Sequence, residues 1–168
     1  MNAPEILQKL AARFPDAGLA LQGQLPSDPS ITLPASLLVD AARFLKGEPD
    51  LAFDFLRCLG GVDFKDRMET VYHLYSMRHN HSIVLKVSLP SQNLEVDSVS
   101  SIWSSANWFE RETFDLLGIR FAGHPDLRRI MLPPDWDGHP LRKDFAEKDN
   151  YHGIPTDRFD PVGGRKNA

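Results

Sequence analysis

The chain has 168 residues, of which 42% are hydrophobic and 25% charged, and its formal net charge at pH 7 is −4. This size and content suit one globular domain, or one domain with a tail, and the acidic balance argues against a uniformly basic protein that binds nucleic acid. Cys58 is the single cysteine, so no disulfide can form within the chain. Neither a signal peptide nor a stretch of roughly 20 apolar residues is visible, so we expect any membrane association to depend on partner chains.

The first half of the chain predicts helices and short strands in alternation. Apolar residues at helical spacing predict two amphipathic helices, Pro4–Phe14 and Pro34–Lys46. Alternating residues predict two short strands, Gly18–Leu25 and Ile31–Leu33. The stretch Leu51–Phe64 fits either a strand or a helical turn, ending in a loop at the paired glycines Gly60 and Gly61.

The second half predicts a hairpin, a helix and a last strand. The hairpin strands are Met68–Met77 and Ser82–Leu89, which are joined by a turn at residues 79–81. The helix spans Ser98–Leu117, with a possible break near Ser104 and Ser105, and Gly118 ends it. Arg128–Leu132 is predicted to be the last strand.

This order of elements predicts an α/β domain of the α+β type, with a mixed sheet packed on helices in two layers. We assign it to residues 1–132. From Pro133 onward, proline and glycine recur and aromatic residues follow no period, which is not compatible with a long helix or strand. Residues 133–168 are therefore predicted to be an extended tail that becomes ordered on a partner, although docking on its own domain is the simpler alternative.

The helix Asn107–Leu117 carries most of the candidate site. On a helical projection Asn107 caps the start, with Glu110 completing a capping box. Arg111 and Asp115 fall on the face opposite the apolar one.

Two glutamates of this helix, Glu110 and Glu112, fall within or beside the apolar arcs, where an unpaired charge is costly. We expect a partner for them, either Arg128 or Arg129 of this chain or a residue of another subunit. The same spacing also fits an ordinary amphipathic helix with charged shoulders.

The residues after this helix extend the pattern into a denser motif. In order, the motif is Glu110-Arg111-Glu112, Asp115-Leu116-Leu117-Gly118, His124, Arg128, Ile130-Met131, and Gly138-His139-Pro140-Leu141-Arg142-Lys143-Asp144-Phe145. Over Trp103–Phe145, about a quarter of the chain, this motif resembles that of the C subunit (30 kDa subunit) of the proton-pumping NADH:quinone oxidoreductase, complex I.

The resemblance implies a structural subunit of the peripheral arm, on the cytoplasmic face of the inner membrane. It implies packing against the D subunit, which forms part of the quinone pocket, with the B and I subunits nearby. FMN and iron–sulfur clusters would belong to partner subunits, and this chain would hold no cofactor, metal or catalytic residue. The single cysteine and the lack of a G-x-G-x-x-G or P-loop motif agree. The residues expected to have interface or structural roles are Glu110, Arg111, Glu112, Asp115, His124, Arg128, Trp136, His139, Arg142, Lys143 and Phe145.

Two other functions remain open from the sequence. The equivalent small subunit of a complex I-related membrane-bound hydrogenase or dehydrogenase shares the motif. A metal-dependent hydrolase that uses His124, His139 and His152 is a more distant alternative, since none of these histidines has a tight ligand spacing.

Overall fold

The computed structural model describes residues 1–23 and 29–156. Its main layer is a five-stranded sheet in the order β1-β2-β5-β4-β3. The strands are β1 (Ala20–Gln22), β2 (Ser30–Leu33), β3 (Phe55–Asp63), β4 (Arg67–Ser76) and β5 (His81–Pro90). β2 and β5 run parallel, whereas the other neighbours run antiparallel. The predicted mixed sheet is therefore confirmed.

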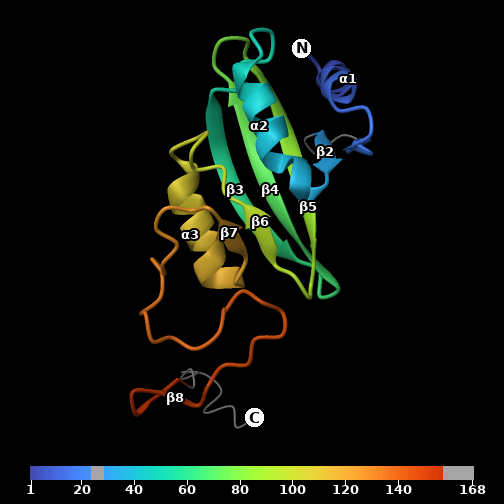
Figure 1. Ribbon diagram of the computed structural model, residues 1–168. Helices are drawn as coiled ribbons and strands as arrows, with labels where there is room; N and C mark the ends of the chain where they lie inside the picture. The colour runs from blue at the N-terminus through green and yellow to red at the C-terminus, as the bar shows by residue number, and fades with distance from the viewer. Residues whose placement is uncertain (24–28, 157–168) are drawn as a thin grey trace, which may run out of the picture.

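Within these residues, three α-helices form the second layer: α1 (Ala3–Arg13), α2 (Leu38–Gly47) and α3 (Ala106–Leu117). In Figure 1, α2 lies across the sheet, α3 lies beside β3, and α1 lies toward the other edge. The core forms between the layers because β4 and β5 alternate: Tyr72, Leu74, Ile83 and Leu85 are buried, whereas the residues between them are mostly more exposed. No helix in the described part of the chain has the length and apolar content needed to span a bilayer.

The helices and strands predicted for the N-terminal half are present, but their first and last residues differ from the prediction. The first helix is present, with Asn2 and Glu5 forming its capping box. The second begins as a 3-10 turn, η1 (Ala35–Leu37), before α2. The first predicted strand is shortened to β1, and residues 24–25 of it lie outside the described residues. The hairpin β4–β5 is confirmed, although its turn lies one or two residues earlier because His81 already begins β5.

The predicted loop at Gly60 and Gly61 is wrong, because both residues lie within β3. A Cβ atom built on Gly61 would lie 2.5 Å from Leu117 Cδ1 and 3.1 Å from Thr113 Cγ2. Glycine at this position therefore lets α3 pack directly onto the strand. The neighbouring Gly60 has open space where its Cβ would be.

Two predictions around α3 are also wrong. The helix begins at Ala106 and not at Ser98, and residues 98–105 form turns before it. Arg128–Leu132 is a loop and not a strand. The strands that the sequence did not predict are β6 (Glu95–Asp97) and β7 (Arg120–Ala122), which pair in parallel, and β8 (Asn150–Tyr151) and β9 (Ile154–Pro155), which form a small hairpin.

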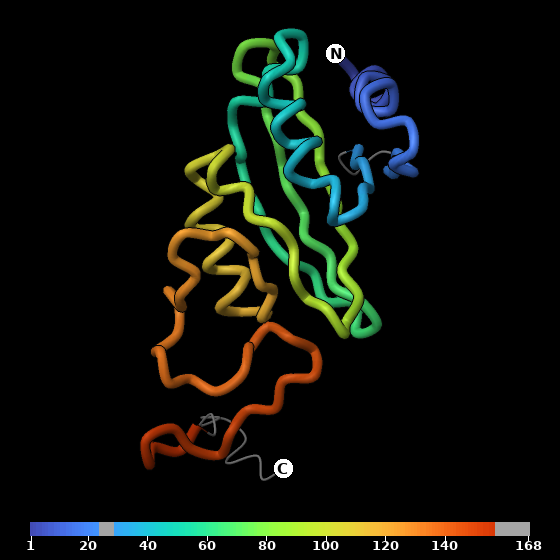
Figure 2. The backbone as a smooth tube through the Cα atoms, in the orientation of Figure 1, coloured from blue at the N-terminus to red at the C-terminus, as the bar shows by residue number. Residues whose placement is uncertain are grey.

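The segment after β7 runs away from the sheet. Figure 2 shows it passing around the end of α3 and continuing toward the C-terminus beyond the two layers. The helix α3 therefore lies between the sheet and the start of the C-terminal segment.

Candidate protein interface around helix α3

Glu110, a residue of α3, is fully buried. Its two carboxylate oxygens accept hydrogen bonds from Ser98 Oγ (2.6 Å) and from the backbone N–H of Val99 (2.8 Å). Burial raises the pKa of Glu110 to about 7, and these two hydrogen bonds oppose the shift. Glu110 therefore ties the turn before α3 to the helix and does not form the predicted capping box. The N-cap position is Ser105, whose side chain makes no capping bond.

The residue nearest to Glu110 that can carry positive charge is His124, and not the predicted Arg128 or Arg129. His124 Nε2 lies 3.9 Å from Glu110 Oε2, and both side chains are inaccessible to solvent. His124 Nδ1 accepts the backbone N–H of Asp126 (3.0 Å), so Nε2 carries the proton and donates to the carbonyl of Asn107 (3.2 Å). The histidine thus fixes the loop after β7 against α3.

Asp115 is the second buried acid of α3, although the sequence places it on the polar face. Its Oδ2 accepts three backbone N–H groups, from Ile130, Met131 and Leu132, at 2.7–3.0 Å. Its Oδ1 accepts a bond from Arg129 (2.9 Å). Burial alone would raise the pKa of Asp115, but these N–H groups and the guanidinium outweigh it and hold the pKa below its usual value.

This arrangement explains why Arg128–Leu132 is not a strand. Three of its N–H groups, those of residues 130–132, donate to one carboxylate oxygen, and so they are not available to a neighbouring strand. Arg129 also donates to the carbonyl of Gly138 (2.9 Å), which joins this loop to the next segment.

Arg111 and Arg128 both lie close to the carboxylate of Asp126. Arg111 is buried, contrary to the sequence projection, and donates to the Arg128 carbonyl (3.2 Å). Its guanidinium lies 3.7 Å from Asp126 and 5.0 Å from the centre of the Trp108 ring. Arg128 itself is exposed and pairs with Asp126 at 2.9 Å.

The end of α3 binds the C-terminal segment through main-chain groups. His139 Nδ1 donates to the Asp115 carbonyl (2.9 Å), and the N–H of Leu141 donates to the Leu116 carbonyl (3.0 Å). Gly118, at φ +78°, ends the helix; a Cβ there would lie 2.7 Å from the His139 ring. These contacts satisfy carbonyls that a helix end leaves without intrahelical partners.

The same segment reaches the sheet at Asp63, the last residue of β3. Asp63 Oδ2 accepts the backbone N–H of Lys143 (2.9 Å), while Oδ1 accepts that of Lys65 (2.7 Å). These two N–H groups, that of Lys143 first, hold the pKa of Asp63 below its usual value. The first part of the predicted tail, up to Lys143, is therefore attached to its own domain. The division of the chain at residue 132 stays a prediction.

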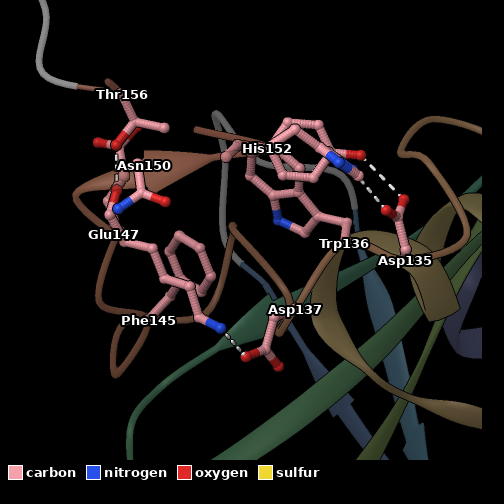
Figure 3. Close-up of a pocket in the computed structure, with 10 residues that line it drawn as sticks. Asp135, Trp136, Asp137, Phe145, Glu147, Asn150, His152 and Thr156 are labelled. Carbon is pink, nitrogen blue, oxygen red and sulfur yellow. Dashed lines mark hydrogen bonds and ion pairs between the residues drawn. The ribbon is translucent and has the colours of Figure 1, made fainter. Parts of the chain in front are cut away.

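Beyond Lys143 the chain folds around a cavity of about 280 Å³ (Figure 3). Trp136 and Phe145 line it, and the rings of Trp136 and Tyr151 lie 5.1 Å apart. Asp135 accepts hydrogen bonds from Tyr151 (2.8 Å) and His152 (2.6 Å). The buried Nε1 of Trp136 has no hydrogen-bond partner among the described residues. Residues 157–168 of the predicted tail lie outside the described residues.

The outer surface of this region is apolar at several positions. Trp108, Met131 and Leu141 are 63%, 61% and 60% exposed, and Ile154 is 68% exposed. Glu112 also faces solvent, so the prediction that it lies among apolar residues is wrong. Arg142 pairs with Asp144 (3.0 Å) at this surface. Large apolar side chains displayed next to a fixed backbone are typical of a protein interface.

The three histidines of the hydrolase alternative do not come together. His124 binds Asn107, His139 binds the end of α3, and His152 binds Asp135. Among residues 1–23 and 29–156, no group of three or more His, Cys, Asp or Glu side chains is arranged to hold a metal ion. The geometry therefore favours histidines that fix loops over histidines that bind metal.

Sequence reasoning missed three residues that organise this site: Ser98, Asp63 and Gly61. Ser98 lies 12 residues from Glu110, and Asp63 lies 80 residues from Lys143, so no local spacing indicates these two bonds. Gly61 carried a usable signal, because a glycine between apolar strand residues often marks a close approach of another element.

Comparison with known proteins identifies the family of the chain. The profile of the family described as "Respiratory-chain NADH dehydrogenase, 30 Kd subunit" matches residues 31–151. A protein from Roseiflexus castenholzii, named as the C subunit of NADH-quinone oxidoreductase, is 46% identical over 147 residues, which cover 86% of this chain and 84% of that protein. A protein from Methylococcus capsulatus, named as the C/D subunit of NADH-quinone oxidoreductase, is 38% identical, over 88% of this chain and 27% of its own length.

Solved structures share the fold. The trypsin-resistant fragment of Nqo5 superposes with a TM-score of 0.65 at 27% identity, over 76% of this chain and all of that one. A chain of the archaeal membrane-bound sulfane sulfur reductase superposes with a TM-score of 0.71 at 23% identity, over 85% of each chain, which shows a common fold. The family match covers β3, β4, β5, α3 and the segment that α3 holds, and it begins within β2. The chain belongs to the family of the 30 Kd subunit of respiratory-chain NADH dehydrogenase.

Proposed function

We propose that this chain is a structural subunit of the peripheral arm of a proton-translocating NADH:quinone oxidoreductase. It supports electron transfer from NADH to quinone by holding neighbouring subunits in place, on the cytoplasmic face of the inner membrane. The observation that carries this proposal is the segment from Arg129 to Lys143. Its backbone is fixed by Asp115, α3 and Asp63, while its side chains Met131 and Leu141 face outward.

We further propose that the main partner is the D subunit, which lies next to the quinone site, with the B and I subunits nearby. The relatives named as C/D subunits support this pairing, because one polypeptide there carries both names. Linking two chains that already associate raises their effective concentration without a new contact. The relatives' names also favour this complex over the related hydrogenases.

In this proposal the chain carries no redox cofactor of its own, and FMN and iron–sulfur clusters belong to partner subunits. Cys58 alone cannot supply the several thiolates that cysteine-ligated clusters use. The buried acids of α3 hydrogen-bond to this chain's own backbone and side chains, so their role here is to position loops.

Co-expression with the D subunit tests the proposal. The Leu141→Asp variant should associate with the D subunit at least about tenfold more weakly, because it places a charge in an apolar contact. Met77→Asp is the matched control: Met77 is 69% exposed in the β4–β5 turn, away from this surface, and its change should leave association within about twofold. Equal effects of the two substitutions, or no association of the wild-type chain, would contradict the proposal.

A further inference from the structure

A cleft of about 310 Å³ lies where the β3–β4 turn meets the segment that follows Leu141. Its charged lining consists of four cations and two carboxylates: Lys65, Arg67, Arg142, Lys143, Asp63 and Asp144. The chain as a whole has a net charge of −4, so this cleft concentrates positive charge on an otherwise acidic protein.

Both carboxylates of the cleft are already engaged. Asp63 accepts the backbone N–H groups of Lys65 and Lys143, one on each oxygen, and so brings these two lysines to the same place. Asp144 accepts both of its bonds from Arg142, at 3.0 and 3.2 Å.

The arginine on the sheet side is engaged as well. Arg67 pairs with Asp66 (3.1 Å) and Glu69 (3.3 Å), and it lies over the ring of Phe64. The ammonium groups of Lys65 and Lys143, in contrast, make no ion pair within the described part of the chain. Two ammonium groups without an ion pair therefore remain at the cleft.

We propose that this cleft binds an acidic segment of a partner protein, with one carboxylate facing Lys65 and another facing Lys143. Carboxylate suits the cleft better than phosphate for two reasons. The backbone N–H groups that would cradle a phosphate are occupied by Asp63. The nearby carboxylates of Asp63 and Asp144 also repel a doubly charged phosphate more strongly than a singly charged carboxylate.

The position of the cleft indicates where the acidic segment comes from. Its outer wall, Arg142–Asp144, directly continues from Leu141, whose exposed side chain is part of the proposed partner surface. A partner that covers Leu141 therefore reaches the cleft next. In this respect the inference rests on the proposed function, and it adds an electrostatic contact to an apolar one.

Charge reversal tests the contact in the assembled complex. The double variant Lys65→Glu/Lys143→Glu retains the hydrogen bonds of Asp63, because Asp63 binds the backbone N–H groups and not the side chains of these residues. We expect its dissociation constant for the co-expressed D subunit to rise on the order of tenfold at low salt, with a weaker dependence on salt than in the wild type. Lys86→Glu on β5 is the control, since Lys86 also makes no ion pair among the described residues, and it should change binding by less than about twofold.

The outcomes separate the two proposals. If wild type and double variant bind the D subunit equally, with the same salt dependence, the acidic-segment inference is wrong and the proposed function stands. If the wild-type chain does not bind at all, both are wrong. A thermal melt of each variant shows whether folding is retained, and the milder Lys65→Gln/Lys143→Gln pair should show the same direction of change if it is not.

The ligand class is tested on the full chain by nuclear magnetic resonance. Titration with hexaglutamate should shift the signals of Lys65 and Lys143 at a lower concentration than inorganic phosphate does, and the double variant should abolish this response. Equal or stronger shifts with phosphate would overturn the assignment to carboxylates.

Discussion

At the scale of single residues, the two buried acids of α3 are stabilised by different means. Asp115 receives three backbone N–H groups and a guanidinium, so its charge is well satisfied. Glu110 receives two donors, and the nearest side chain that can be cationic, His124, lies 3.9 Å away and hydrogen-bonds to backbone groups. Buried charge is costly unless it is matched, and so the two carboxyl groups have pKa values displaced in opposite directions.

This difference makes folding stability depend on pH through Glu110. Its folded pKa of about 7 lies above its ordinary value of 4.5, so the folded state binds the proton more tightly than the unfolded state. The corresponding stability is fully present below about pH 4.5 and is lost as pH rises through about 7. Glu110→Gln should remove this component, which is on the order of 3 kcal/mol. Urea unfolding of both proteins between pH 5 and pH 8 measures it, and parallel curves would show that Glu110 does not titrate there.

Asp115→Ala should destabilise the chain by roughly 3–5 kcal/mol, because it leaves Arg129 and three N–H groups without their acceptor. Glu112→Ala, on the exposed face of the same helix, should change the free energy of unfolding by less than about 0.5 kcal/mol. Denaturant unfolding of the isolated chain compares the two. A similar loss for both variants would mean that α3 is sensitive to any change of charge.

At the scale of elements, sequence patterns correctly predicted the helices and strands that depend on neighbouring residues. The hairpin β4–β5 and the helices α1 and α2 follow from alternation and helical spacing. The wrongly predicted elements are those in which residues distant in the sequence determine the structure. The N–H groups of residues 130–132 bind Asp115 and therefore do not form a strand. Glu110 binds Ser98 and Val99, which therefore lie in a turn before α3. In the site, the burial of Arg111 and the exposure of Glu112 were not predicted, because helical phase alone does not show which loop covers a face. The interface roles of the site residues stay predictions.

The packing of α3 on β3 is tested by paired glycine substitutions. Gly61→Ala should destabilise the chain by roughly 1–3 kcal/mol, because the new methyl group meets Leu117, Ile119 and Thr113. Gly60→Ala has open space at the same strand and should be neutral or slightly stabilising. Thermal denaturation of the two variants compares them, and equal melting temperatures would contradict the close packing at Gly61.

At the scale of the whole molecule, the chain is a two-layer domain that supports a segment directed away from it (Figure 1). The segment is fixed as far as Lys143 by α3 and Asp63. Beyond it, β8 and β9 pair over only two residues each, and their hairpin contacts the preceding segment at Asp135 and Trp136. A hairpin of that size with so little burial is marginal in water. We therefore expect residues 146–156 to depend on a partner for stable order, as the composition of the tail suggested.

Amide hydrogen exchange, measured on the isolated chain and on the complex with the D subunit, tests the central claim most directly. The N–H of Leu141, bonded to the Leu116 carbonyl, should be protected in both states and serves as the internal reference. Residues 146–156 should exchange rapidly in the isolated chain and at least about tenfold more slowly in the complex, because the partner orders them. Equal protection of residues 146–156 in both states would contradict the account of this chain as a partner-ordered structural subunit.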